Sequence, residues 1–431
     1  MNLKTVNNLF IVCFCLIINY IEANDEISVT TKSQKFVGLK KTIDEKEIDY
    51  FLGIPYAEPP IGKLRFKKPK PFKYDKPINA TKWPNVCYQN YPITHPIFTS
   101  HNMSEDCLYL NIWSPKIGGL LKPVMFWIHG GGFVSGTASL ELYNGEVLAS
   151  RGDVVVVTIN YRLQALGFLY TGSDDAPGNI GLWDQTLALQ WVKDNIEGFG
   201  GDPQQVTIFG ESAGSWSVGL HILSPITRNL FKNAIMMSAG PLSHLTGENP
   251  TTAKNNWLKV AKFADCGNGT DFSLSVIECL QNISAEKLVK VADRHDMTTY
   301  TALFMSNVRY GDEFLPKKPV DMLKNKDHKK NVKLIAGFTD DEGSWLLADR
   351  IDTIKYALIN PANLTKSQAY EELKKLSEKL ITPSGHVNGD DVAKLYLSRL
   401  PNSDYDLIRR TIGVALGDFY ISCTTALFAK H

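Results

Sequence analysis

The residues best suited to covalent chemistry lie at positions 210–214, where the chain reads Gly-Glu-Ser-Ala-Gly. A short apolar run at 207–209 precedes this motif, and a helical pattern follows it. Small residues on both sides of a serine allow a sharp strand-to-helix turn that leaves its hydroxyl exposed. Ser212 is therefore the candidate nucleophile. A Gly/Ser loop has the same composition, so the rest of the chain must decide between the two interpretations.

A second reactive element follows the apolar run at 123–128, where residues 129–133 read His-Gly-Gly-Gly-Phe. Because glycine has no Cβ, two consecutive N–H groups can turn towards one point and a substrate carbonyl can approach the backbone. We expect the N–H groups of Gly131, Gly132 and Ala213 to form an oxyanion hole. The alternative is a flexible glycine turn. The presence of both motifs in one chain favours the oxyanion hole.

The elements that must position these motifs alternate between strands and helices. Continuous apolar runs predict strands that are buried on both faces, and spacings of three and four predict amphipathic helices. The pattern indicates an α/β fold with a mostly parallel, doubly wound central sheet, flanked by helices, with its reactive turns at the carboxyl edges. Strands are predicted at 104–113, 123–128, 153–162, 207–209, 234–237 and 332–337. Helices are predicted at 183–196, 367–380, 390–400 and 406–431.

Two other segments have distinct patterns. Residues 50–60 are dense in proline and aromatic residues and are predicted to be a rigid, extended surface connection. Residues 241–323 are helix-rich without a clear period, which is typical of an insertion that covers a pocket. We expect this insertion to lie over the reactive turns.

Composition and charge limit the possible partners. The 431 residues include 46 Lys and Arg against 45 Asp and Glu, which gives a net charge of +1. Nothing in this balance points to nucleic acid. The one basic run, residues 63–76, is broken by proline and aromatic residues and is interpreted as a solvated surface loop. No metal site or cofactor is predicted, and the sequence leaves a homo-oligomer open.

The N-terminus indicates secretion. Residues 1–23 contain one lysine followed by a short apolar core and end at a small residue, Ala23, which is typical of a secretory signal peptide. The apolar core is too short to span a membrane stably, and no second run of membrane length follows, so no transmembrane segment is predicted. Five Asn-x-Ser/Thr sequons agree with passage through the secretory pathway. Their asparagines are Asn79, Asn102, Asn268, Asn282 and Asn363.

Cysteine pairing follows from the same compartment. Of the seven cysteines, the two at positions 13 and 15 would leave with the signal peptide. In an oxidising compartment the simplest pairings join near neighbours, Cys87 with Cys107 and Cys266 with Cys279. Cys423 then has no partner, and the simplest interpretation is a buried free thiol.

Four motifs together resemble one protein family. They are Glu-Asp-Cys-Leu-Tyr-Leu-Asn at 105–111, the glycine motif at 129–133, the serine motif at 210–214 and Asp-Glu-Gly-Ser at 341–344. Their order and spacing are similar to those of the type-B carboxylesterase and cholinesterase family of α/β-hydrolases, from about residue 27 to the last residue. The resemblance implies one α/β-hydrolase domain at 24–431 that cleaves small-molecule carboxylic esters through an acyl-enzyme.

The resemblance also assigns roles. It implies that Ser212 is the nucleophile and that Glu342 is the acid that orients the catalytic histidine. Without the family, Glu342 would be interpreted as a helix-start acid beside two aspartates. Gly131, Gly132 and Ala213 match the family's oxyanion hole. The family pattern further includes the two disulfides and the ion pairs Arg65–Glu105 and Arg162–Asp184.

Two departures from the family are important. Cholinesterases of the family carry a tryptophan shortly before the Ser-Glu-Asp-Cys motif that stacks on the choline cation. Here residues 95–100 read His-Pro-Ile-Phe-Thr-Ser, which argues against choline selectivity. The chain order of this fold is serine, acid, histidine. Beyond Glu342 only His386 and His431 remain, and neither is predicted to follow a strand.

These observations lead to three hypotheses. The first is a secreted serine esterase whose histidine, together with the partner of Cys423, lies beyond a C-terminal truncation. The second is a non-catalytic, secreted ligand-binding or cell-adhesion protein on the same fold. The third is an incomplete chain that does not fold. Retention of both Ser212 and Glu342 favours the first hypothesis.

Overall fold

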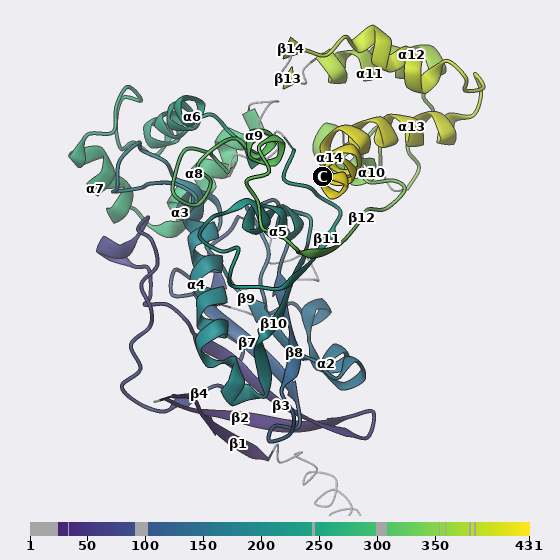
Figure 1. Ribbon diagram of the computed structural model, residues 1–431. Helices are drawn as coiled ribbons and strands as arrows, with labels where there is room; N and C mark the ends of the chain where they lie inside the picture. The colour runs from purple at the N-terminus through teal and green to yellow at the C-terminus, as the bar shows by residue number, and fades with distance from the viewer. Residues whose placement is uncertain are drawn as a thin grey trace, which may run out of the picture.

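The computed structural model describes residues 25–32, 34–90, 102–243, 246–298, 308–352, 354–357, 359–378, 381–382 and 385–431 (Figure 1). Its main feature is one large sheet with strand order β1-β2-β3-β7-β9-β8-β10-β11-β12, with β4 paired to β2. The strands of this sheet are β1 (Glu26–Thr30), β2 (Lys35–Ile43), β3 (Lys46–Pro55), β4 (Ile78–Asn79), β7 (Tyr109–Pro115), β8 (Lys122–Ile128), β9 (Val155–Ile159), β10 (Gly201–Glu211), β11 (Asn233–Met237) and β12 (Lys333–Gly337).

Strand direction divides the sheet into two parts. β1, β2, β3 and β7 pair antiparallel, and β7 is also antiparallel to β9. From β9 through β8, β10 and β11 to β12 every pairing is parallel. All five residues of β9 are buried, as expected for a strand covered on both faces. The prediction of a mostly parallel central sheet flanked by helices is therefore confirmed.

The parallel part brings the two sequence motifs together. The glycine motif begins directly after β8, and Ser212 directly follows β10. These strands are neighbours, with Ile128 opposite Gly210 in the register. Because the carboxyl ends of parallel strands meet at one edge, the motifs share that edge. Glu342 follows β12, two strands further along the same sheet.

Helices cover the sheet as the sequence pattern predicts. The helix predicted at 183–196 is α4 (Ile180–Asn195), and α5 (Ala213–Leu223) packs on β10, β11 and β8. α2 (Glu146–Gly152) lies against β7, β3 and β9. The remaining elements of this half are α3 (Gln164–Phe168), the 3₁₀ turns η1 (Gly62–Leu64), η3 (Glu141–Tyr143) and η4 (Ile196–Phe199), and the small pair β5 (Val86–Cys87) with β6 (Met103–Ser104).

The insertion predicted at 241–323 is helical. It contains α6 (Pro250–Phe263), α7 (Leu274–Asn282), α8 (Ala285–Thr298) and α9 (Pro319–Lys324). The disulfide Cys266–Cys279 joins the end of α6 to α7. In Figure 1 these helices gather beyond the end of the sheet at which α5 begins.

The C-terminal part forms a second group of helices, drawn in yellow-green to yellow in Figure 1. The helices predicted at 367–380, 390–400 and 406–431 are present. They are α11 (Lys366–Glu378), α12 (Gly389–Leu397) and a continuous helix made of α13 (Tyr405–Gly417), the π-helical turn η7 (Asp418–Ser422) and α14 (Cys423–Lys430). Shorter elements are α10 (Ser344–Leu346), the π-helical turn η6 (Leu347–Ile351) and the pair β13 (Ile381–Thr382) with β14 (Gly385–His386).

The helix at 405–430 bears on the membrane prediction. In the part of the chain with described positions it alone is long and apolar enough to cross a bilayer. However, 56% of its most apolar window is buried inside the fold, and core helices of soluble proteins have the same composition. This helix is therefore weak evidence for a membrane span.

Two predictions are wrong. Residues 50–55 belong to β3 and not to a surface connection, and Phe51 and Ile54 are fully buried. Proline is tolerated because Pro55 is the last residue of the strand, where a missing N–H costs least. Cys423 has no disulfide partner, as expected, but its thiol is exposed at the surface and not buried.

Candidate active site

Ser212 occupies the sharp turn that its motif predicts. Its backbone has φ 55° and ψ −120°, between the last residue of β10 and the first residue of α5. The Ser212 N–H donates to the Met237 carbonyl of the neighbouring strand β11 (2.9 Å), and the Ser212 carbonyl accepts from the Trp216 N–H (2.9 Å). A non-glycine residue in such a conformation costs roughly 1–3 kcal/mol and persists only when its surroundings hold it.

The surroundings that hold this turn are close backbone contacts. A Cβ on Gly214 would lie 2.0 Å from the Ile128 carbonyl oxygen, and one on Gly210 would lie 2.7 Å from the same atom. Neither space admits a side chain. The glycines of the motif therefore let α5 and β10 pass directly against the end of β8.

The glycine motif lies against the serine turn. A Cβ on Gly130 would lie 2.6 Å from Glu211 Oε2 and 3.1 Å from Ser212 Cβ. Gly131 and Gly132 both have positive φ, at 102° and 62°, in the region that favours glycine. The structure thus brings the two predicted motifs into contact.

Gly131 and Ala213, two of the three predicted oxyanion donors, lie in the glycine loop and at the start of α5. The Gly131 carbonyl is turned into its own loop, where it accepts from the N–H groups of Val134 and Ser135 (both 2.9 Å). Ala213 is the first residue of α5, so its N–H has no acceptor within the helix, and the helix dipole favours negative charge there.

Glu342 is buried close to the same edge, with 7% of its surface exposed. Its Oε1 accepts from the Thr339 N–H (2.7 Å), which fixes the carboxylate within the turn after β12. The next residue, Gly343, packs so closely on α13 that a Cβ there would lie 1.9 Å from the Gly413 carbonyl. Glu342 is therefore held between the sheet and the C-terminal helices.

Glu211 is a feature that the sequence reasoning missed. Packing of its carboxyl against the turn and the nearby negative charge of Glu342 raise the pKa of Glu211 to about 7. The residue as a whole is exposed at the end of β10, so solvent screens part of this effect. Its protonation thus changes near neutral pH, one residue away from Ser212.

The histidines with described side chains have other partners. The His129 ring stacks on Tyr161 at 4.3 Å between centroids, and its Nδ1 lies 2.8 Å from the Gly130 carbonyl. Burial lowers the pKa of His129 to about 4, so the ring is neutral and donates through Nδ1. Burial likewise lowers the pKa of His221 to about 3, and its ring contacts Gln185 and Thr227.

The two histidines after Glu342 lie on different elements. His431 is exposed at the end of α14, and the backbone of His386 belongs to β14, which differs from the predicted loop. The side chain of His386 lies outside the described residues. Among the hydrogen bonds of the described side chains, none joins a histidine to Ser212 or Glu342.

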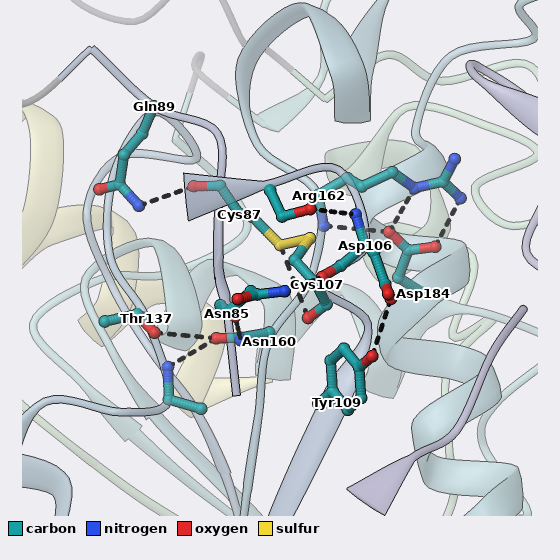
Figure 2. The surroundings of a disulfide bond; sticks show 12 residues. Asn85, Cys87, Gln89, Asp106, Cys107, Tyr109, Thr137, Asn160, Arg162 and Asp184 are labelled. Carbon is teal, nitrogen blue, oxygen red and sulfur yellow. Dashed lines mark hydrogen bonds and ion pairs between the residues drawn. A yellow bond between two sulfur atoms is a disulfide. The ribbon is translucent and has the colours of Figure 1, made fainter. Parts of the chain in front are cut away.

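Figure 2 shows the network of hydrogen bonds and ion pairs around the disulfide between Cys87 and Cys107. Cys87 pairs with Cys107, as the sequence predicts, with 5.0 Å between their Cα atoms. Two residues later, Gln89 accepts from the Gly136 N–H (2.9 Å) and donates to the Gly136 carbonyl (3.0 Å) and the Cys87 carbonyl (3.1 Å). The segment after the disulfide therefore holds the loop that leaves the glycine motif.

Asn160 at the end of β9 supports the same loop. Its Nδ2 donates to the Asn85 carbonyl (2.9 Å), while its Oδ1 accepts from the Thr137 hydroxyl (3.1 Å) and the Ala138 N–H (2.8 Å) (Figure 2). One amide thus joins the disulfide segment, β9 and the loop. Sequence reasoning missed both Gln89 and Asn160. The only sequence signals are that Gln89 lies close to a cysteine and that Asn160 lies at the end of a strand.

The two expected ion pairs are present. Arg162 donates to Asp184 from its backbone N–H, Nε and Nη2 at 3.0, 2.8 and 2.6 Å, and both side chains are buried (Figure 2). Arg65 forms a fork with Glu105 at 2.7 and 2.5 Å. The Nη1 of Arg65 also donates to two carbonyls, of Leu280 and Ile283, so this pair anchors α7 to the sheet domain.

The remaining predicted residues fall into two groups. The asparagines of all five sequons are exposed: Asn79, Asn102, Asn268, Asn282 and Asn363. Residues 95–100, which precede the Ser-Glu-Asp-Cys motif and contain no tryptophan, lie outside the described residues. In the described part of the chain no group of three or more His, Cys, Asp or Glu side chains could hold a metal ion.

The contact at Gly214 generates a first prediction. Gly214→Ala would press a methyl group onto the Ile128 carbonyl, so we expect it to lower the free energy of unfolding by about 3 kcal/mol or more. The matched control is Gly337→Ala in β12, where a Cβ would meet nothing within 4 Å and φ is not positive. Urea unfolding of both variants measures the difference. Equal loss in the two variants would show that the turn is not held by this contact.

The pKa of Glu211 generates a second prediction. Because its folded-state pKa lies above its unfolded value, the folded chain binds the proton more tightly. The stability of the wild type should therefore fall, relative to Glu211→Gln, as pH rises from about 4.5 to about 7. After allowance for solvent screening we expect a change of about 1 kcal/mol.

Urea unfolding at pH 5 and pH 8 measures this difference. Glu342→Gln is measured as a second variant. Removing the charge next to Glu211 should make the free energy of unfolding depend less on pH. A stability difference that is the same at both pH values would contradict the assigned pKa.

Comparison with known proteins agrees with this geometry. Acetylcholinesterase-1 of Trittame loki is 36% identical over 417 residues, which cover 93% of this chain and 73% of that protein. The cholinesterase of Mus musculus is 35% identical over 435 residues, covering 98% and 70%. The acetylcholinesterase of Danio rerio is 42% identical over 344 residues, covering 76% and 53%. A sequence model described as the carboxylesterase family matches residues 25–431. The chain therefore belongs to the carboxylesterase family.

Proposed function

We propose that this chain is a serine hydrolase that cleaves carboxylic esters through an acyl-enzyme on Ser212. The observation that carries the proposal is the strained Ser212 backbone, held against the glycine motif, whose N–H groups would form the oxyanion hole together with that of Ala213. The close approach of Gly210 and Gly214 to the Ile128 carbonyl holds this strained backbone in place. The cholinesterases among the relatives support an ester as the substrate.

In the proposed reaction, Ser212 Oγ attacks the ester carbonyl carbon and its proton passes to a base. The carbonyl oxygen becomes an oxyanion that accepts from the N–H groups of Gly131, Gly132 and Ala213. The alcohol then leaves with the proton, and water cleaves the acyl–Ser212 bond by the same steps. Glu342 would orient the base.

The described residues do not identify the general base that would accept the Ser212 proton. The family resemblance assigns it to a histidine, and no described histidine side chain forms a hydrogen bond with Ser212 or Glu342. In a serine protease, losing the base costs about a million-fold in turnover and leaves roughly 10³ to 10⁴ over water, from binding and the oxyanion hole. We therefore propose that these 431 residues alone are a weak esterase.

A non-catalytic, secreted ligand-binding or cell-adhesion protein is the alternative. The lack of a described base favours it. The retained nucleophile turn and buried acid favour the esterase, because a binding protein would not need either. For the substrate we propose simple carboxylic esters in preference to choline esters, since residues 95–100 contain no tryptophan.

Chemical rescue tests the esterase proposal. Free imidazole can replace a missing histidine, so we expect it to accelerate hydrolysis of a small aryl acetate by the wild type. Ser398→Ala, which removes an exposed serine, is the control and should respond as the wild type does. Ser212→Ala should not respond, once the reaction of imidazole with the ester in buffer is subtracted. The expected increase is at least about tenfold at saturating imidazole.

Mass spectrometry should also find the transient acetyl group on the peptide that contains Ser212. Equal rescue of Ser212→Ala would overturn the proposal. Fast, Ser212-dependent turnover without imidazole would instead show that the chain supplies its own base.

We also propose that residues 1–23 are a signal peptide and that the chain is secreted as a glycoprotein. Two disulfides support an oxidising compartment, and the exposed sequon asparagines are open to glycan attachment. Expression of the full chain in a eukaryotic secretory host should release protein that begins near Asn24. Treatment with an amidase that removes N-glycans should lower its mass. Retention inside the cell with Met1 intact and an unchanged mass would contradict the proposal.

A further inference from the structure

The chain contains a basic run that sequence reasoning missed. Residues 317–330 hold six lysines against two aspartates, in a chain whose net charge is only +1. This run begins just before α9 and ends in the turn that leads to β12. A run of charge is ordinarily a solvated face. The question is therefore whether acidic side chains neutralise it, and the basic run at 63–76 provides a comparison within the same chain.

The two runs differ in their acidic partners. In the run at 63–76 four cations have a carboxylate within 2.5 to 3.8 Å: Arg65, Lys67, Lys68 and Lys73. In the run at 317–330 none of the six lysines forms an ion pair with a described side chain. Its Asp327 pairs with Arg228, outside the run, at 3.1 Å. The run at 317–330 thus keeps its positive charge.

The turn after α9 gathers part of this charge in one place. Two hydrogen bonds reverse the chain there, from the N–H groups of Lys326 and Asp327 to the carbonyls at positions 323 and 322 (2.9 and 2.8 Å). Lys324, Lys326 and Lys330 are exposed around this turn. The Lys330 Nζ also donates to the Lys326 carbonyl, which keeps that side chain over the turn.

A neighbouring segment, residues 224–232, holds the turn and adds a further lysine. The Lys329 Nζ donates to the Arg228 carbonyl (2.6 Å) and lies 5.1 Å from the centre of the Phe231 ring. Lys232 is exposed directly before β11. Because β11 and β12 are parallel neighbours, the segments that precede them lie at the same edge of the sheet. We call the exposed lysines at this edge the lysine surface; they are Lys232, Lys324, Lys326 and Lys330.

The lysine surface lies at the opposite edge of the sheet from the candidate active site. Ser212 and Glu342 follow the carboxyl ends of β10 and β12, whereas the lysine surface precedes the amino ends of β11 and β12. A polyanion bound to the lysine surface would therefore leave the edge that carries Ser212 open.

The chemistry of the surface limits the kind of polyanion. Lysine ammonium groups are compact, strongly hydrated charges that suit single anionic groups. Proteins that bind single-stranded nucleic acid also offer exposed aromatic rings, but Phe231 is buried under Lys329. The two disulfides support an oxidising compartment, whereas anionic lipids face the cytoplasm. The polyanions typical of the extracellular space are sulfated polysaccharides.

We propose that the lysine surface binds a sulfated polysaccharide, whose sulfate groups would accept from the lysine Nζ atoms. Binding would hold the protein on an extracellular polyanion while Ser212 stays accessible. The extracellular setting rests on the secretion proposed above, but the binding itself can be measured without it. The proposal does not depend on esterase activity, because none of its residues belongs to the candidate active site.

The experiment titrates a fluorescent heparin dodecasaccharide with the full chain and follows the anisotropy at about 50 and about 200 mM NaCl. The test variant replaces the three lysines of the turn together, Lys324→Gln, Lys326→Gln and Lys330→Gln. We expect it to weaken binding about tenfold or more at the lower salt concentration. Because fewer counterions are released, the slope of log Kd against log salt should also fall by about two to three.

A matched control removes the same charge from the other basic run. Lys63→Gln, Lys70→Gln and Lys76→Gln replace three exposed lysines that have no acidic partner among the described residues, and together they should weaken binding less than about threefold. Arginine at the three positions of the turn keeps the charge and should retain binding, which separates loss of charge from damage to the turn. Ser212→Ala should bind as the wild type does, and unsulfated heparosan should not bind.

Several results would overturn the proposal. They are no binding of heparin at the lower salt concentration, equal weakening in the two glutamine variants, and loss of binding in the arginine variant. Tighter binding to phosphatidylserine vesicles, or to a single-stranded DNA of the same charge, than to heparin would assign the surface to another class of polyanion and would also reject it.

Discussion

The structure of the candidate site depends on one steric constraint, the close passage of α5 and β10 against the end of β8. The Ile128 carbonyl lies where side chains of Gly210 and Gly214 would be, so only glycine backbone fits. Because the helix must begin this close to the strand, the residue between them is forced into a strained conformation. That residue is Ser212. The same closeness places the glycine motif, which leaves β8, beside the serine.

A second layer keeps the glycine motif in place. The loop after it is held by Gln89 through two hydrogen bonds with Gly136, and by Asn160 through Thr137 and Ala138. Gln89 lies two residues after Cys87, so the disulfide limits the movement of this support. The loop that leaves the glycine motif is thus fixed by residues outside the motif. Preorganisation of this kind is what makes backbone N–H groups effective in stabilising a developing charge.

Much of this arrangement could be predicted from the sequence, because its signals are local. The turn at Ser212 and the glycine triplet are each indicated by a run of adjacent residues. The helix after residue 180 is indicated by the spacing of its apolar residues. The supports were missed because Gln89 and Gly136 are 47 residues apart and meet only through the fold. Burial raises the pKa of Glu211, and the charge of Glu342, two strands away in the sheet, raises it further. The segment at 50–55 was misjudged because composition does not reveal that its proline ends a buried strand.

The most direct test of the central claim is whether Ser212 and the N–H groups beside it accept a tetrahedral oxyanion. An alkylboronic acid forms such an adduct with a serine hydroxyl without requiring turnover, and ¹¹B NMR distinguishes tetrahedral from trigonal boron. We expect a tetrahedral signal with the wild type and only trigonal boron with Ser212→Ala. Trigonal boron in both, or tetrahedral boron in both, would contradict it.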